Sequence, residues 1–297
     1  MCGIMGYYCF SNNKPDIEKL ADMFCLLQSR GTDASGLSFI KPDGSLYIHK
    51  APTRSSHLIK TDEWKNIEMP PVMIMHCRLK TQGTEKNNAN NHPLFSKNGI
   101  ALVHNGIIYN DKEIFSKKNR DAEVDSEAIL SLLSSKHKGD KIRLLFDRIE
   151  GSFAVAAINK SEPGKLLLIK KDNPVDLYFD SENDILYFCS ERQIMQEALG
   201  VKGKSKRGFN LGEGSYHFYE MENNHALIIN QDGVQSYKRY RPKIDDWVSI
   251  KDTRPYGFTA DMVECPWCYT QTIFDFNRQN NDCEYCGHPI YEEDVYV

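Results

Sequence analysis

The first residues after Met1, Cys2–Tyr8 (CGIMGYY), are apolar or small and carry no charge. A short apolar run interrupted by glycine is typical of a buried strand. We therefore expect a core strand that starts at the chain terminus itself. A terminus held in this way is structured rather than frayed, and this constrains the fold more than any other feature of the sequence.

Helix and strand patterns alternate along the next part of the chain. Helices are expected at Ile17–Leu27 closed by Gly31, at a segment capped by Asp125 or Ser126, and at Lys141–Ile149 closed by Gly151. Strands are expected at Gly36–Ile40, Leu46–Lys50, Val72–Cys77, Ile100–Val103, Ser152–Ile158, Lys165–Ile169, Ile185–Cys189 and Tyr216–Tyr219. The pattern predicts a mixed α+β fold.

The composition limits the classes of function. With 297 residues and 40% hydrophobic content, the chain can bury a core and is not disordered as a whole. Its 37 Lys and Arg against 41 Asp and Glu give a net charge of -4, which argues against a nucleic-acid or membrane partner. The sequence has neither an apolar run of the roughly 20 residues that span a bilayer nor an export signal. We expect a cytoplasmic protein.

Cys2 directly follows the initiator methionine, which is normally removed before a small residue. The exposed residue would carry both an α-amine, with a pKa of roughly 7.7 to 8, and a thiol, with a pKa of roughly 8.5. One residue could then supply a nucleophile and its base near neutral pH. Taken alone, Cys2 is better explained as a small buried residue.

Further motifs decide between these two readings. They are Arg30–Gly36 (RGTDASG), His76–Gly83 (HCRLKTQG), Asn90–Pro93 (NNHP), His104–Asn110 (HNGIIYN), Asp125–Glu127 (DSE), Glu150–Ala154 (EGSFA) and Cys189–Glu191 (CSE). Together with the start MCGIMGYY, and in this order, the set resembles the class II, or N-terminal-nucleophile, glutamine amidotransferases. The glutaminase domain of glucosamine-6-phosphate synthase is the nearest type.

The resemblance implies a four-layer αββα sandwich and a role for each matched residue. Asn105, through its side-chain amide, and Gly106, through its backbone N–H, would form the oxyanion hole, with Cys2 as nucleophile. Arg78 would bind the α-carboxylate of glutamine in the bidentate way that lysine cannot reproduce. Asp125 would bind the α-ammonium group, and Thr81 would assist.

Other residues in these motifs receive structural interpretations. Arg30 and Asp33 are expected to brace the loop around the nucleophile, and His76 and His104 to be interior histidines. The family commonly has an aromatic residue at the position of Leu79 and a histidine at that of Gln82. These departures put the affinity for glutamine in question.

Four cysteines near the end of the chain form two CxxC pairs, Cys265 with Cys268 and Cys283 with Cys286, separated by 14 residues. This spacing predicts a structural zinc site with four thiolate ligands in a small zinc ribbon. A redox pair is disfavoured because a second matching pair is present and no βαβ pattern surrounds the first. The acidic residues of the tail argue against phosphate binding.

The sequence therefore predicts a glutaminase domain at 2–247, a linker at 248–260 and a zinc ribbon at 261–297. The expected reaction is hydrolysis of glutamine to glutamate and ammonia, with the ammonia delivered to a separate acceptor enzyme. Two alternatives stay open. One is hydrolysis of another γ-glutamyl or amide compound, and the other is a noncatalytic binding module that uses the ribbon for recognition.

Overall fold

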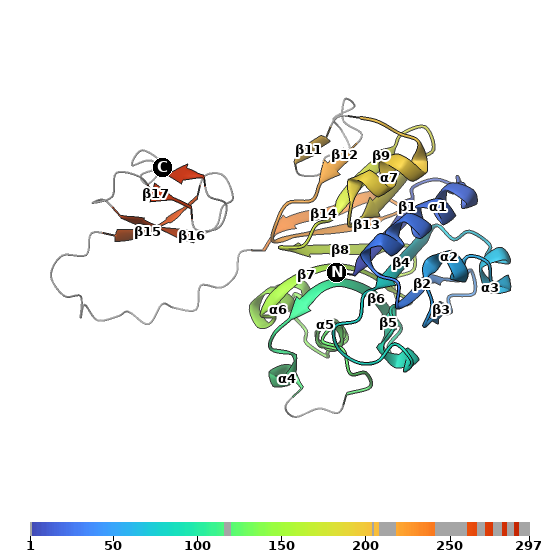
Figure 1. Cartoon of the computed structure of the whole chain (residues 1–297), viewed down its shortest axis with the longest axis horizontal. Helices are drawn as coiled ribbons and strands as arrows, with labels where there is room; N and C mark the ends of the chain where they lie inside the picture. Colours follow the sequence, from blue (N-terminus) through green and yellow to red (C-terminus); the bar gives the residue numbers. More distant parts are fainter. Residues whose placement is uncertain are drawn as a thin grey trace. The chain divides into compact units, whose positions relative to one another are not determined.

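Figure 1 shows the computed structural model of the chain. It describes residues 2–115, 120–203, 205–207, 218–240, 260–265, 271–275, 281–283 and 288–290. The chain divides into two compact units, Met1–Lys243 and Ile244–Val297. The predicted linker at 248–260 lies outside the described residues, apart from Ala260.

The first unit contains a sheet of eight strands in the order β11-β12-β9-β10-β1-β4-β2-β3. Their bounds are β1 Gly3–Cys9, β2 Ala34–Ile40, β3 Leu46–Ala51, β4 Val72–Arg78, β9 Asp176–Asp180, β10 Ile185–Cys189, β11 Ser205–Arg207 and β12 Phe218–Glu220. β1 lies inside this sheet, antiparallel to β10 and to β4. All of its residues are buried, so the expected core strand at the terminus is present.

A second sheet of six strands has the order β14-β13-β8-β7-β6-β5. Its strands are β5 Leu94–Phe95, β6 Ile100–Ile108, β7 Gly151–Asn159, β8 Leu166–Lys171, β13 His225–Asn230 and β14 Gly233–Arg239. A hydrophobic cluster that includes Ile4 and Ile74 of the first sheet and Val103 and Ala156 of the second fills the space between them. The two sheets are thus packed face to face.

Helices cover the outer faces of the two sheets. They are α1 Ile17–Leu27, α2 Ser55–Leu58, α3 Asp62–Lys65, α4 Asp111–Ile114, α5 Ser126–Leu133, α6 Lys141–Arg148 and α7 Arg192–Leu199, with 3₁₀ turns at Gln28–Arg30 and Asn88–Asn90. One apolar cluster joins α1 and α7 to the eight-stranded sheet, and another joins α5 and α6 to the six-stranded sheet. Figure 1 shows these helix pairs on the two sides of the sheets. The layers are therefore helix, sheet, sheet, helix, as the resemblance implied.

Several element boundaries differ from the sequence prediction, and two of them have a clear cause. The helix predicted at Lys141–Ile149, α6, ends at Arg148, and Gly151 begins β7 instead of closing that helix. Gly151 has φ 132°, and a Cβ there would lie 2.1 Å from the Ile107 carbonyl oxygen, so strand pairing requires the glycine. The strand predicted at Ile100–Val103 continues to Ile108 because β7 pairs with it along this whole length.

The second unit contains two small antiparallel hairpins within its described residues. β15 (Ala260–Glu264) pairs with β16 (Gln271–Asp275), and β17 (Asn281–Asp282) pairs with β18 (Pro289–Ile290). Across the described parts of both units, no helix has the length and apolar content needed to cross a bilayer.

Candidate active site

Cys2 lies directly before β1, next to the end of β4. Gly3 pairs with Cys77, and the Cys2 thiol donates a hydrogen bond of 3.4 Å to the Leu79 carbonyl. Burial raises the pKa of this thiol; the Arg78 guanidinium opposes that rise, and the Asp125 carboxylate adds to it. The thiol is therefore protonated near neutral pH and needs a base before it can act as a nucleophile.

Two residues of the RGTDASG motif hold the backbone around Cys2. Arg30 donates from Nε to the Cys2 carbonyl at 3.2 Å, and its Nη1 forms a 2.7 Å ion pair with Glu191. Asp33 accepts a hydrogen bond of 2.7 Å from the Lys80 N–H and donates its own N–H to the Arg78 carbonyl. Both side chains hold the main chain beside Cys2 in place, as expected from the sequence.

Asn105 lies inside β6, opposite Ala154 of β7, and is 1% exposed. Its Nδ2 and Oδ1 atoms are both buried, and neither has a hydrogen-bond partner among the described residues. An unpaired buried amide costs about 1 to 3 kcal/mol and is uncommon in folded proteins. The amide is therefore available to a ligand that supplies the missing partner.

Gly106 follows in the same strand, opposite Phe153. Its φ is 151°, and an added Cβ would lie 2.0 Å from the Ser152 carbonyl oxygen and 2.8 Å from His104 Nε2. No other residue type fits this position without moving β7. The glycine lets the backbone beside Asn105 run close to its neighbours.

Arg78 ends β4 and is buried, with its guanidinium held by the loop that follows. Nη1 donates to Asn91 Oδ1 at 2.7 Å, and Nη2 donates to the carbonyls of Gln82 and, at 2.9 Å, Gly83. A guanidinium has five N–H donors. Within the described chain, these contacts leave the Nε hydrogen and one Nη1 hydrogen. The two point to opposite sides of the guanidinium, so a carboxylate can accept from either one but not from both in the expected bidentate way.

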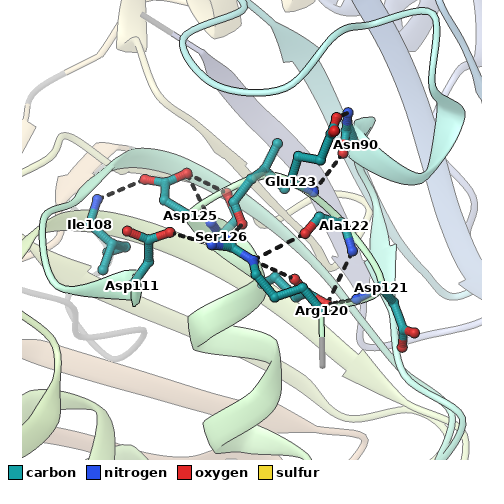
Figure 2. Close-up of polar contacts among 11 residues, drawn as sticks. Asn90, Ile108, Asp111, Arg120, Asp121, Ala122, Glu123, Asp125 and Ser126 are labelled. Carbon is teal, nitrogen blue, oxygen red and sulfur yellow. Dashed lines mark hydrogen bonds and ion pairs between the residues drawn. The ribbon is translucent and has the colours of Figure 1, made fainter. Parts of the chain in front are cut away.

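Asp125 is the N-cap residue of α5 and is 6% exposed. Its Oδ2 accepts a hydrogen bond of 2.7 Å from the Ile108 N–H, and its Oδ1 accepts one of 2.9 Å from the Ser126 N–H (Figure 2). Ile108 is two residues beyond Gly106, so this carboxylate is fixed to the strand that carries Asn105. An ionised carboxylate has about four acceptor positions, which leaves capacity for an ammonium group.

Thr81 stands apart from the buried groups of the site. It is exposed in the loop after β4 and lines an open pocket with Lys80, Gly83, Thr84 and Glu123. The structure thus brings Cys2, Arg78 and Asp125 within electrostatic reach of one another and leaves Thr81 at the rim.

Three buried histidines connect the motifs behind the site. His76 Nε2 is hydrogen-bonded to the His104 carbonyl at 3.0 Å, and His104 Nδ1 to Ser126 Oγ at 2.7 Å. The His92 ring lies 4.3 Å from that of His76. Burial lowers the pKa of His76 to about 3 and lowers those of His92 and His104. The rings are neutral interior groups, which agrees with the interpretation of His76 and His104 from sequence.

Sequence reasoning gave no role to Asn91 or Lys50, yet both hold the loop at Arg78. Asn91 binds the guanidinium through Oδ1, and Lys50 Nζ donates to the carbonyls of Asn91 at 2.6 Å and Pro93 at 3.0 Å. Asn91 belongs to the NNHP motif, which was a signal that could have found it. Lys50 lies in a hairpin strand without a motif and gave no signal.

Two of the four predicted zinc ligands are described. Cys265 and Cys283 are both buried, in a small cluster with Val263, Phe274 and Ile290. The Cys283 N–H donates to the His288 carbonyl at 2.8 Å. Cys268 and Cys286 lie outside the described residues. In the part of the chain that is described, no three His, Cys, Asp or Glu side chains are grouped as metal ligands.

Comparisons with known proteins agree with this geometry. Residues 76–197 match the family model described as glutamine amidotransferase domain. Glutamine--fructose-6-phosphate aminotransferase (isomerizing) of Caldanaerobacter subterraneus is 34% identical over 184 residues, covering 59% of this chain and 29% of that protein. The protein of the same name from Thermotoga maritima is 30% identical over 314 residues, covering 100% of this chain and 47% of that protein.

The same fold occurs in a solved structure. Glutamine phosphoribosylpyrophosphate amidotransferase from B. subtilis superposes with a TM-score of 0.62 at 19% identity, over 81% of this chain and 49% of that one. The chain spans less than half the length of each of these relatives. The relatives in this class are enzymes. The family match and the shared fold together show that the chain carries a glutamine amidotransferase domain of class II, homologous to the glutaminase part of these aminotransferases.

Proposed function

We propose that this protein hydrolyses the side-chain amide of glutamine through a thioester on Cys2 and supplies the ammonia to an acceptor enzyme. The observation that carries the proposal is the buried Asn105 amide, which has no partner in the described chain and lies in the strand fixed to Asp125. A catalytic oxyanion hole needs such a preorganised donor. Arg78 and Asp125 supply the opposite charges that the two ends of a free amino acid require.

The proposed reaction begins with a proton transfer within Cys2. After loss of Met1, the Cys2 α-amine accepts the thiol proton, and the thiolate attacks the γ-carbonyl carbon of glutamine. The oxygen that becomes negative is stabilised by the Asn105 amide and the Gly106 N–H. Ammonia leaves with the proton returned by the amine, and water then cleaves the γ-glutamyl thioester to glutamate.

The test is direct measurement of both products with the purified full chain. Wild-type protein should release glutamate and ammonia in equal amounts from glutamine, and Cys2→Ala should lose at least about 10⁴-fold in kcat. Glutaminase activity that persists unchanged in Cys2→Ala would refute the proposal. It would also revive the idea of a noncatalytic module that is contaminated by another enzyme.

A second candidate is hydrolysis of another γ-glutamyl or amide compound. Leu79 favours it, because this side chain is 41% exposed where the family has an aromatic residue, and its carbonyl contacts the Cys2 thiol. The two candidates are separated by kcat/KM for glutamine against γ-glutamyl amides and N-acylated glutamine. A preference for glutamine of less than about tenfold would favour the second candidate.

For the second unit we propose a structural zinc ion held by Cys265, Cys268, Cys283 and Cys286. The burial of Cys265 and Cys283 in one cluster supports it, and a tetrahedral thiolate set suits zinc. The proposal implies a reducing compartment such as the cytoplasm. Metal analysis should give one zinc per chain, and Cys268→Ser with Cys286→Ser should abolish it. One zinc per chain in that double variant would contradict the four-cysteine site.

We also propose that the acceptor of the ammonia is carried on another polypeptide. The relatives are named for amino transfer from glutamine to fructose 6-phosphate, a reaction in which glutamine nitrogen reaches a second substrate. Affinity capture from native extract should recover an enzyme with an ammonia-dependent synthetic reaction. Recovery of the chain alone, together with glutamine-dependent synthesis by the purified chain, would place the acceptor within this protein.

A further inference from the structure

Arg120 lies at the centre of a side-chain network just before Asp125 (Figure 2). Its Nη1 forms a 2.7 Å ion pair with Asp111, and its Nε forms one of 3.2 Å with Glu127. Both carboxylates are buried, at 3% and 7% exposed. The guanidinium also lies over the Phe115 ring, 4.9 Å from its centroid. One cation therefore compensates two buried negative charges.

The same network fixes the backbone that leads into Asp125. Arg120 donates from Nη2 to the Val124 carbonyl at 2.7 Å and from Nε to the Ala122 carbonyl at 3.2 Å. Glu127 lies in the first turn of α5, and its carboxylate accepts hydrogen bonds from the N–H groups of Asp121 at 2.6 Å and Ala122 at 3.2 Å. The segment 121–124 belongs to no strand or helix, so these side chains replace strand pairing as its support.

The far side of this segment is tied to the loop beside Arg78. The Glu123 N–H donates to Asn90 Oδ1 at 2.8 Å, and Asn90 Nδ2 donates to Glu123 Oε2 at 2.7 Å (Figure 2). Asn90 precedes Asn91, which binds the Arg78 guanidinium. The position of the Asp125 carboxylate relative to Arg78 thus depends on segment 121–124 keeping its shape.

We propose that Arg120 is the positioning residue for Asp125, and that it thereby determines the preference for substrates with a free α-ammonium group. The inference rests on the proposed function, in which Asp125 binds that group. Arg120 touches no substrate and acts through segment 121–124. None of the motifs that carry the family resemblance includes Arg120.

The physical argument concerns what happens when the cation is removed. Without Arg120, Asp111 and Glu127 are two buried carboxylates without this partner, and breaking such pairs is strongly unfavourable. The unpaired Glu127 carboxylate is then more stable when it turns toward water, and in turning it releases the N–H groups of Asp121 and Ala122. Segment 121–124, which leads into Asp125, then loses its support. The positions of Cys2, Asn105 and Gly106 are unaffected, because they depend on strands β1, β6 and β7. Recognition of the ammonium group should fail before the chemical step does.

The experiment compares glutamine with glutaramate, the same amide without the α-amine. In wild-type protein the ratio of the two kcat/KM values should be roughly 10 to 100, the usual effect of a charged hydrogen bond. Arg120→Met should lower this ratio at least fivefold, and Arg120→Lys should lower it less. Both substrates are measured on one preparation, so the fraction of folded protein cancels.

A control and a cycle separate positioning from general destabilisation. Arg143→Met removes another partly exposed arginine, which pairs with Asp147 at 3.1 Å on α6, and should leave the ratio unchanged. Asp125→Asn should lower the ratio, and adding Arg120→Met to it should produce no further fall. An unchanged ratio in Arg120→Met, with both activities reduced equally, would overturn the inference and leave the proposed function standing. Wild-type protein that hydrolyses neither substrate would overturn both.

Discussion

The candidate site holds its proposed reacting groups and its charged groups in two different ways. The proposed reacting groups are Cys2, Asn105 and Gly106, and the charged groups are Arg78 and Asp125. The reacting groups lie on or beside paired strands, and their positions follow from the register of β1 with β4 and of β6 with β7. The charged groups depend in addition on loop segments. The Arg78 guanidinium is held by loop carbonyls and Asn91, and Asp125, whose carboxylate accepts from the Ile108 N–H of β6, follows the segment organised by Arg120.

This difference explains why two departures from the family pattern leave the contacts seen here intact. Gln82 contacts Arg78 through its main-chain carbonyl, and Leu79 contacts Cys2 through its main-chain carbonyl. Neither contact requires a particular side chain at that position. Changes in residue type can therefore alter what the pocket recognises while the loop still holds Arg78, whereas the strand-borne groups tolerate little change, as the space around Gly106 shows.

After Cys2→Ala, the largest effect on activity is expected for Asn105→Ala, which also lies among the groups held by paired strands. Loss of one oxyanion donor should lower kcat for glutamine about 100- to 1000-fold with little change in KM. Steady-state kinetics measure both values, and Asn98→Ala, an exposed asparagine in the turn before β6, is the matched control. A variant with unchanged kcat and a raised KM would assign Asn105 to substrate binding and contradict its place among the reacting groups.

A smaller effect, on KM instead of kcat, is expected for Asp125→Asn. Asparagine keeps one acceptor oxygen, loses the charge and turns its NH2 group toward either the Ile108 or the Ser126 N–H. The variant should therefore be less stable but folded, and kcat/KM for glutamine should fall roughly 10- to 100-fold. The fall should come mainly from KM. Equal activity toward glutamine in this variant and the wild type would show that Asp125 does not bind the α-ammonium group.

The pH dependence of kcat/KM tests the base proposed for Cys2. Because burial raises the pKa of the thiol, a base must take its proton. The proposed base, the α-amine of Cys2, is active only when unprotonated. Activity should therefore fall as pH drops below the α-amine pKa of roughly 7.7 to 8, approaching tenfold per pH unit. Activity that stays constant from pH 8 down to pH 6 would exclude this amine as the base.

The smallest effect on activity is expected for Lys50→Met, which removes support from the loop beside Arg78 and should raise KM slightly. Burial, aided by the Arg78 charge, lowers the pKa of Lys50 from 10.5 to about 8. Between these values the unfolded chain binds more protons than the folded one, so stability of the wild type relative to Lys50→Met should rise with pH. Urea unfolding from pH 7 to pH 10 measures this, and a difference that shrinks over that range would contradict it.

The strand-borne side of the site was accessible from the sequence because short motifs and apolar periodicity mark it. The strand at Cys2–Tyr8 and the helix at Ile17–Leu27 were found within one residue of their ends. The continuation of β6 through Asn105 and Gly106 was missed, since Asn-Gly has low strand propensity and only pairing with β7 imposes the extended form.

The support of the charged groups was not accessible for a different reason. Arg120 reaches Glu127, and Lys50 reaches Asn91 and Pro93, through side-chain contacts that follow no periodic pattern. Helix α7 and the hairpin β13–β14 were also missed, and β13 has polar residues at both ends. Such features depend on tertiary neighbours that local propensity does not encode.

The central claim is that Cys2, as the amino-terminal residue, carries the acyl group during turnover. Acid-quenched reaction with glutamine, followed by peptide mass spectrometry, tests this directly. We expect an amino-terminal peptide that begins at Cys2 and bears one γ-glutamyl group, and its absence in Asn105→Ala at the same early time. An active preparation whose amino-terminal peptide retains Met1, or whose γ-glutamyl group lies on another cysteine, would contradict the account.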